Sequence, residues 1–420
     1  MFNPYDPAFH SDPYISYAAL RDGPSIYRTN LNGWNMVLLT RHADITAALR
    51  SPRLGRSQTM SSPEAMPSPY RAIMVLLSNW MLLKNPPDHT RLRSLVNRAF
   101  TPRVVEQLEP RIALIAAELL ADARERGTLE LISDFAFPLP VIVIAELLGV
   151  PAEDRALFRR WSEVLVANID LFQDDTTWRA GSQVAGEISN YLRDLIVQRR
   201  AAPRDDLLSA LVAAEDGGDR LSEDELIANC SLLLAAGHET TVNLIGNGTL
   251  ALLRNPNQLT MLRQEPALID NAVEELLRYE SPVQMTSRDV LADFELPGGT
   301  LSAGEECAAG DRAGNRDPEV FADPDRLDIQ RSNAVKHLAF AAGIHFVCRG
   351  SARRAEGRAA FQALLTLGEL RLRDPEPPLR PTIALRGRSR IALAVEGGAR
   401  GARRWAAQAQ PLRARRHQRC

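Results

Sequence analysis

Residues 222–241 read Ser-Glu-Asp-Glu-Leu-Ile-Ala-Asn-Cys-Ser-Leu-Leu-Leu-Ala-Ala-Gly-His-Glu-Thr-Thr, and this stretch decides the fold. Ser222 and Glu225 match a capping box, in which each side chain accepts a hydrogen bond from the backbone N–H of the other residue. The apolar pattern continues to Leu253 and stops before Asn255-Pro256. With a rise of about 1.5 Å per residue, such a helix is roughly 45–50 Å long. It is long enough to cross a whole domain.

A polar patch interrupts the apolar run near the middle of this helix, at Gly237-His-Glu-Thr-Thr241. Gly237 lets another group approach the backbone, and the hydroxyl of Thr240 can bond back to a carbonyl of the preceding turn. The adjacent carboxyl and hydroxyl groups of Glu239 and Thr240 can deliver protons to a buried reactive centre. A helix kink with satisfied polar side chains explains the same pattern. Both interpretations stay open on this segment alone.

A second informative segment is the loop Phe340-Ala-Ala-Gly-Ile-His-Phe-Val-Cys-Arg-Gly350, which opens an apparent helix. The thiolate of Cys348 at this junction can serve as an axial ligand for haem iron. The backbone N–H groups of the helix start would stabilise its negative charge. A buried thiol that packs as a small hydrophobe explains the same residue. The loop alone does not separate the two interpretations.

Two further pairs of charged residues have helical spacing. Glu275 and Arg278 lie three apart, so an ion pair is available, although such pairs are common and weak when exposed. His89 and Arg93 lie four apart after a proline pair, so both face the same way. Together they suit an anion such as a carboxylate or phosphate. Taken alone, they fit a solvated basic face better.

Composition limits the classes of function. The chain has 420 residues, of which 45% are hydrophobic and 24% charged, as in ordinary globular proteins. The net charge of −2 gives no indication of nucleic acid or a membrane surface as a partner. The N-terminus does not resemble a signal peptide, and no apolar run has the length of a membrane span. The four cysteines have no paired spacing, which fits free thiols in a reducing cytoplasm: Cys230, Cys307, Cys348 and Cys420.

The pattern predicts one mainly helical domain with small β-sheets over residues 1–396. Strands are expected at 33–40, 283–310 and 380–395. Helices are expected at 103–125, 138–148, 153–171, 179–200 and 205–215. Residues 397–420 carry seven arginines, which is typical of a basic arm for nucleic acid or an acidic partner. We favour a disordered, incidental extension, because the tail lacks interleaved aromatic residues apart from Trp405.

The order of these segments resembles one family, the cytochrome P-450 haem-thiolate monooxygenases, and within it the soluble bacterial type. The resemblance runs from about Asn3 to Arg386. It implies a single-domain cytochrome P-450 fold with the long central helix over a haem b that has an axial thiolate. The motifs that carry it are the helix with His89 and Arg93, Ala236-Gly-His-Glu-Thr-Thr241, Glu275-x-x-Arg278, Asn315-Arg-Asp-Pro318, Phe321-x-x-Pro-x-x-Leu-Asp328 and Phe340-x-x-Gly-x-His345.

The resemblance also assigns roles to individual residues. Glu275, Arg278 and, as the third partner, Arg326 match a buried ion network on the haem-binding side. The thiolate of Cys348 is expected to be the iron ligand. Gly237, Glu239 and Thr240 match the groove that binds oxygen, where the acid and the alcohol feed protons to dioxygen. The positions that match binders of the haem propionates are His89, Arg93, Arg288 and His345.

The sequence departs from the family pattern at three places. Val347 stands where the family has its cysteine, and Cys348 follows one residue later. Residues 307–313 and 349–354 lack the expected apolar pattern, and the C-terminal strand region drifts from about Arg388, yet the register recovers after each internal patch. Compensated reading-frame errors in the gene explain these departures, a hypothesis that resequencing refutes if the codons stand as written.

A degenerate haem protein that does not oxidise its ligands is the main alternative function. A peroxide-driven enzyme fits less well, because the Glu239-Thr240 pair is intact.

The resemblance implies O2 and a lipophilic small molecule as substrates, of fatty acyl, macrolide or polyketide type. Electrons are expected from a separate ferredoxin and ferredoxin reductase, with Arg349, Arg353 and Arg354 facing an acidic partner. The substrate pocket is expected between the 60–80 loop, the 165–185 segment, residues 234–236 and residues 283–287. Its apolar lining would include Met60, Met66, Met74, Leu165, Leu171, Phe172, Val283 and Met285, of which at least half can be ordinary core residues.

Overall fold

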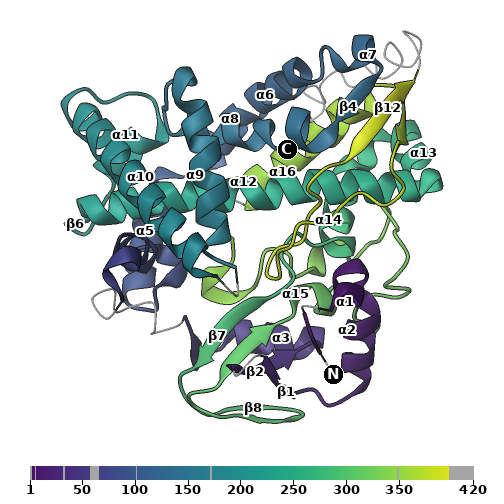
Figure 1. The fold of residues 1–420 in the computed structure, drawn as a ribbon, viewed down its shortest axis with the longest axis horizontal. Coiled ribbons are helices and arrows are strands. Elements are labelled where there is room, and N and C mark those ends of the chain that lie inside the picture. Colours follow the sequence, from purple (N-terminus) through teal and green to yellow (C-terminus); the bar gives the residue numbers. More distant parts are fainter. Residues whose placement is uncertain are drawn as a thin grey trace, which may run out of the picture.

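A long helix crosses the molecule, as a computed structural model of the chain shows (Figure 1). The structure describes residues 2–4, 6–31, 34–56, 66–100, 102–170, 173–347 and 350–396. Cys348, Arg349 and the arginine-rich tail at 397–420 lie outside these residues, so the predictions for them stay predictions. In the described part, none of the helices combines the length and apolar character that a membrane crossing requires.

The long helix is α12 (Glu223–Arg254), and its beginning confirms the prediction from the sequence. The Ser222 side chain accepts from the Glu225 N–H at 3.2 Å, and the Glu225 carboxylate accepts from the Ser222 N–H at 2.8 Å. Most of its side chains are buried, because other helices cover it on several sides. The helices that pack on it are α8 (Pro138–Leu147), α9 (Arg155–Ala167), α10 (Asp175–Ala201), α14 (Ile269–Tyr279) and α16 (Gly350–Leu365).

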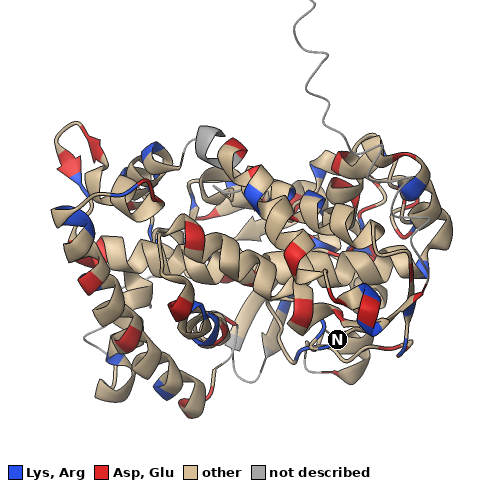
Figure 2. Cartoon of the chain, turned by 90° about the horizontal axis from the view of Figure 1, so that it is seen from above, with Lys and Arg blue, Asp and Glu red and all other residues tan. Residues whose placement is uncertain are grey.

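The remaining helices surround this centre. The helix expected at 103–125 divides into two helices, α6 (Pro102–Leu119) and α7 (Ala123–Arg126). Acidic and basic residues are intermixed along the outer elements (Figure 2). The other helices are α1 (Pro7–Ser11), α2 (Pro13–Asp22), α3 (His42–Arg50), α4 (Arg71–Ser78), α5 (Asp88–Ala99), α11 (Leu207–Ala213), α13 (Pro256–Gln264) and α15 (Asp311–Gly314).

Small sheets lie beside the helices, and the largest has the order β1-β2-β10-β7-β3. Its strands are β1 (Tyr27–Leu31), β2 (Trp34–Leu39), β10 (Glu306–Ala309), β7 (Thr286–Val290) and β3 (Leu54–Gly55). A second sheet joins β11 (Glu369–Leu372), β12 (Ala392–Glu396) and β4 (Thr128–Glu130), so only the end of the expected 380–395 region is a strand. Two hairpins complete the list, β5 (Glu215–Asp216) with β6 (Asp219–Arg220) and β8 (Phe294–Leu296) with β9 (Gly299–Leu301).

Strand β10 forms although its segment lacks the expected apolar pattern. It pairs in parallel with β2 and antiparallel with β7, where Cys307 lies opposite Arg288. These ladders use backbone groups, and the small side chains of Cys307, Ala308 and Ala309 fit a strand buried on both faces. The two residues that follow the turn after β10, Asp311 and Arg312, are also buried.

The predicted ion network is present and fully buried, with one correction. Arg278 Nε and Nη2 donate to the two carboxylate oxygens of Glu275 at 2.7 and 2.8 Å, and both side chains have 0% exposure. The third partner is Arg331, whose Nε lies 3.2 Å from the Glu275 carboxylate. The prediction of Arg326 was wrong, because its side chain is 66% exposed and pairs with Asp328. Arg326 contributes its carbonyl oxygen to the network instead.

We expect Glu275→Ala to lower the free energy of unfolding by about 3–5 kcal/mol, because it strands two buried guanidinium groups. Denaturant unfolding followed by circular dichroism measures this. The matched control is Asp270→Asn on the same helix, whose 73% exposed side chain pairs with Arg358; it should change stability by less than about 1 kcal/mol. Equal effects of the two substitutions would contradict the assignment of a buried network.

Candidate active site

The polar patch of α12 contains a buried acid and a hydroxyl side by side. Glu239 is 3% exposed and forms an ion pair with Arg380, while its Oε2 atom has no hydrogen-bond partner. Burial raises the pKa of Glu239 above its ordinary value, although the Arg380 guanidinium opposes this. Thr240 Oγ1 donates to the Ala236 carbonyl oxygen at 3.1 Å, which is the predicted bond to the preceding turn.

Helix α16 reaches the same patch. Arg353 of α16 donates to the Ala236 carbonyl oxygen, which therefore accepts from Arg353 and from Thr240. One turn further along α16, Glu356 Oε2 accepts from Thr241 Oγ1 at 2.9 Å. Arg353 was predicted to lie on the surface facing a redox partner, but the residue is only 7% exposed and points inward. The loop before α16 and the patch on α12 are thereby neighbours in space.

A cluster of nitrogen donors lies between α5, β7 and the 340–347 loop. The rings of His89 and His345 are 4.3 Å apart between centroids. Arg56 and Arg288 both donate to the Ser287 carbonyl oxygen, at 3.2 and 2.7 Å, so two guanidinium groups lie together. Each of the four side chains has a buried nitrogen without a hydrogen-bond partner: Arg56 Nε, His89 Nδ1, Arg288 Nη2 and His345 Nε2.

The electrostatics of this cluster favour an anion. Burial, together with Arg93 and Arg56, lowers the pKa of His89 to about 4. Burial and the same kind of neighbours lower the pKa of His345, so both imidazoles are neutral near pH 7. Burial lowers the pKa of Arg288 to about 10. Unpartnered buried donors are costly, and an acceptor with negative charge would satisfy them. Arg56 was missed by the sequence analysis, because a single arginine in a proline-rich stretch belongs to no periodic pattern.

Arg93 serves the loop itself. Its Nη2 donates to the Phe346 carbonyl oxygen at 2.7 Å and its Nη1 to the Ile344 carbonyl oxygen at 3.4 Å. The loop requires glycine at Gly343, where φ is +70° and an added Cβ would lie 2.2 Å from the Leu49 carbonyl oxygen. Val347, in the family's cysteine position, is half-buried against the core and donates its N–H to the Phe340 carbonyl oxygen at 3.1 Å.

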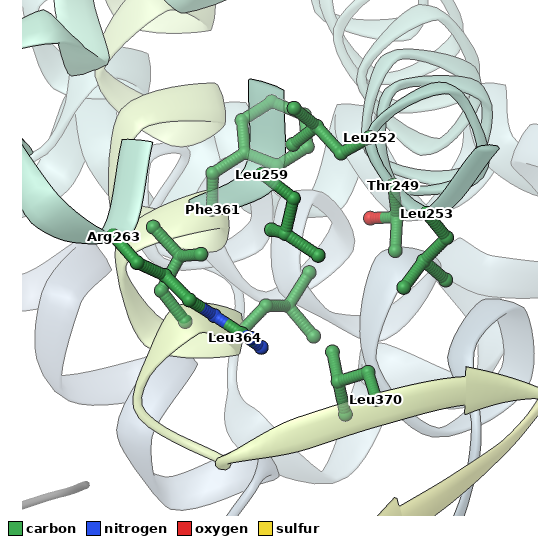
Figure 3. Close-up of a pocket in the computed structure, with 9 residues that line it drawn as sticks. Thr249, Leu252, Leu253, Leu259, Arg263, Phe361, Leu364 and Leu370 are labelled. Atoms are coloured by element: carbon green, nitrogen blue, oxygen red, sulfur yellow. The ribbon is translucent and has the colours of Figure 1, made fainter. Parts of the chain in front are cut away.

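The residues expected to line a substrate pocket have mixed positions. Met60, Leu171 and Phe172 lie outside the described residues. Leu165 and Met285 belong to two different hydrophobic core clusters, as the sequence analysis allowed for part of this set. Met74 is 2% exposed, and Val283 and Met66 are half-buried. An apolar crevice at the far end of α12 contains none of the predicted site residues (Figure 3); it is lined by Thr249, Leu252, Leu253, Leu259, Arg263, Phe361, Leu364, Leu365 and Leu370.

Comparisons with known proteins agree on one family. Residues 155–351 match the cytochrome P450 family. Vitamin D(3) 25-hydroxylase of Pseudonocardia autotrophica is 45% identical over 358 residues, covering 85% of this chain and 86% of that protein. The polyketide biosynthesis cytochrome P450 PksS of Bacillus subtilis is 40% identical, covering 87% and 90%. The crystal structure of P450BioI with an acyl carrier protein ligated to hexadec-9Z-enoic acid superposes with a TM-score of 0.88 at 37% identity, covering 93% and 99%.

The chain belongs to the cytochrome P450 family and has its fold. It is an oxidoreductase of the monooxygenase class, and the family implies a haem with thiolate ligation, O2 and redox partners. The alternative of a degenerate haem protein finds no support in these comparisons. The described residues fit such a cofactor, because the two propionates of a haem match the charge and the hydrogen-bonding type of the orphaned donors.

Proposed function

We propose that this chain uses haem b, with Cys348 as the axial ligand, to insert one oxygen atom of O2 into a lipophilic small molecule. The observation that carries the proposal is the cluster of orphaned donors around His89, Arg288 and His345. This cluster lies beside the loop that leads to Cys348, and helix α16 links that loop to the polar patch of α12. A bound haem supplies the oxidising chemistry, which its thiolate ligand promotes.

The residues of this chain bind and orient the cofactor and manage protons. Arg56, Arg288, His89 and His345 would hold the propionates through their unpartnered nitrogens, and Arg93 fixes the backbone of the cysteine loop. Gly237, which has no side chain, would let the cofactor and oxygen approach the central turn of α12.

Proton supply is proposed to run through Glu239 and Thr240. Burial favours the neutral form of Glu239, and the ion pair with Arg380 favours the charged form, so the carboxyl group can both take up and release a proton. The side chain of Arg380 is 23% exposed and connects Glu239 with the solvent side. The hydroxyl of Thr240, next to it on the helix, passes the proton onward.

The substrate is proposed to be a fatty acyl, macrolide or polyketide molecule. Two relatives support this substrate class. PksS is named for polyketide biosynthesis, and the structure of P450BioI carries a fatty acid on an acyl carrier protein. Met74, an apolar and buried residue of the expected lining, agrees with a lipophilic ligand, while Leu165 and Leu234 belong to a hydrophobic core cluster.

Electrons are proposed to come from a separate ferredoxin and ferredoxin reductase, and the chain to work in the cytoplasm. The arginines expected to face an acidic partner give less support, because Arg353 is buried and Arg354 pairs with Glu274. The remaining support is the cysteine loop, where Ile344 and Phe346 are 51% and 43% exposed and offer apolar contacts. The buried free thiols of Cys230 and Cys307 fit a reducing compartment.

The iron ligand is tested by the spectrum of the reduced protein with carbon monoxide. Thiolate ligation gives a Soret band far to the red of imidazole or water ligation, and we expect this band in the wild type and its loss in Cys348→Ala. The matched control is Cys307→Ala, a buried thiol in β10, which should keep the band. A wild type without the band, or a Cys348→Ala variant that retains it, would refute Cys348 as the ligand.

For the proton path, Glu239→Gln should lower product formation about 100-fold, in the range expected when a general acid is lost. Oxygen consumption should fall less, so that more O2 is used per product formed. The control is Asp224→Asn, an exposed acid in the first turn of the same helix, which should behave as the wild type. Unchanged coupling of oxygen use to product in Glu239→Gln would rule out this role.

The substrate class is tested by spectral titration with a panel of fatty acids and macrolactones. We expect at least one member to shift the Soret band in a saturable way, since an apolar ligand displaces water from the haem pocket. Small hydrophilic molecules of similar functional groups serve as controls. If only these shift the band, the lipophilic assignment is wrong.

A further inference from the structure

Asp311 is a buried acid that the proposed function does not use. It follows β10 at the beginning of the short helix α15 and is 1% exposed. Thr286 Oγ1 donates to its Oδ2 atom at a long distance of 3.4 Å. Its Oδ1 atom is buried and has no hydrogen-bond partner. An acid in such a position needs a partner, because a buried carboxyl group without one is destabilising.

The charged and titratable groups near Asp311 are the arginines of the donor cluster and Tyr17 of α2, whose buried hydroxyl has no hydrogen-bond partner and whose pKa burial raises, so that it stays protonated. Arg288 is the charge that acts most strongly on Asp311, and Arg56 acts on it as well. No hydrogen bond joins Asp311 to either guanidinium group, although Arg288 Nη2, Arg56 Nε and Asp311 Oδ1 are all without partners. Thr286, which contacts Asp311, and Arg288 lie two residues apart on β7, so Asp311 and Arg288 lie on the same face of the sheet with no hydrogen bond between them. A ligand that bridges them must accept from the arginines and interact with a carboxyl group.

Counting charges shows which form of Asp311 fits a haem. Arg56 and Arg288 are the two buried cations beside Asp311, whereas Arg93, which also acts on both histidines, is half-buried and donates to the carbonyl oxygens of Ile344 and Phe346. In the free site the imidazoles of His89 and His345 are neutral near pH 7. A haem brings two negative propionates. With an ionised Asp311 the buried site would hold three negative charges against two positive ones. With a neutral Asp311 the charges balance, and the acid has an O–H group to donate.

We propose that Asp311 is a protonated carboxylic acid in the haem-bound protein, that it donates a hydrogen bond to a haem propionate, and that haem binding takes up one proton from solvent at this side chain. The inference rests on the proposed haem site. It concerns a residue of the 307–313 segment, where the sequence departs from the family pattern, so it is a property of this chain. No covalent bond other than the O–H bond forms, and no redox change is involved.

The titration of Asp311 agrees with this geometry. Burial raises the pKa of Asp311 to about 7, while Arg288, Thr286 and Arg56 act in the opposite direction. The propionates raise it further in the complex, because like charges disfavour the ionised form. A group whose pKa is higher in the bound state stabilises that state fully below its free-state pKa. The affinity for haem must then fall as the pH rises through about 7.

The two histidines of the cluster titrate below the pH range in which Asp311 titrates. The pKa of His89 is lowered to about 4, and that of His345 is also lowered, so in the free site both are already neutral through this pH range. Any contribution from their titration in the complex is shared by variants at position 311. The thiol of Cys307, which lies opposite Arg288 on β10, has a pKa raised by burial to about 12 and stays protonated.

The experiment is haem transfer from the holoprotein to excess apomyoglobin, followed by the Soret band between about pH 6 and pH 8.5. The wild type should retain haem about 10- to 30-fold less well at the upper end, since each pH unit above the free-state pKa costs about a factor of ten. Asp311→Asn keeps a donor without a titrating group, so its retention should match the wild type at the lower pH and change little with pH. The matched control is Glu305→Gln, just before β10, where the side chain pairs with Arg28; this variant should keep the wild-type slope.

Several outcomes would overturn the proposal. If haem retention by Asp311→Asn falls with pH as steeply as in the wild type, Asp311 does not titrate on haem binding. Tighter haem retention of Asp311→Asn at every pH means that the acid is ionised and competes with the propionates for Arg288. If Asp311→Asn does not fold, infrared difference spectra of Asp311→Ala and the wild type decide instead. The wild-type holoprotein should show a protonated carboxylic acid band that the variant lacks, and the absence of that difference refutes the proposal.

A failure of the haem site itself is distinguishable. Arg288→Gln and His89→Gln should both release haem faster than the wild type if the donor cluster binds the propionates. If both retain haem as the wild type does, the proposed site is wrong, and the inference about Asp311 falls with it. If both lose haem quickly while Asp311→Asn keeps the wild-type pH slope, the site is right and only the inference is wrong.

Discussion

The structure depends on the burial of a long helix that carries polar side chains in its middle. Helix α12 is enclosed by other helices, so its patch at Gly237–Thr241 must find partners inside the protein (Figure 1). Each partner comes from a different element. Arg380, from the chain between β11 and β12, pairs with Glu239, Glu356 of α16 accepts from Thr241, and Ser162 of α9 lies 2.8 Å from His238 Nδ1. The patch thereby fixes where three separate segments meet, and a reactive centre placed there would be shielded from water.

The donor cluster lies on the other side of the site, and there buried polar groups remain without partners inside the protein. The α12 patch pairs part of its polar groups and leaves Glu239 Oε2 free, whereas each side chain in the cluster of His89, His345, Arg56 and Arg288 has a buried nitrogen without a partner. Two guanidinium groups share one carbonyl oxygen there, an arrangement that like charges oppose. Such a cluster is stabilised by an anionic ligand, since the ligand supplies the acceptors that the fold withholds. Folding and cofactor binding are therefore linked at the donor cluster.

The elements of the fold and the site that depend on local spacing could be predicted from the sequence. The site residues that were missed or assigned wrongly have a common cause. The capping box, strand β2 and the Glu275–Arg278 pair depend on residues close in the chain, so local spacing identifies them. The third member of the ion network was predicted as Arg326 and is Arg331, because two arginines in one loop cannot be ranked without knowing which one the loop turns inward. Arg56, Arg380 and the inward orientation of Arg353 were missed for the same reason. Their partners lie far away in the sequence.

The segment that departs most from the family pattern shows how a fold tolerates such a change. Strand β10 keeps its place because its ladders with β2 and β7 use backbone groups, which do not depend on side-chain identity. The two residues after the turn that follows β10, Asp311 and Arg312, are buried like the strand itself, although both side chains are charged types that are costly to bury. Arg312 finds an acceptor in the Ser281 carbonyl oxygen at 2.8 Å. Asp311 meets the arginines of the donor cluster instead, so a change that the backbone absorbs without loss of register alters the charge balance of the cofactor site.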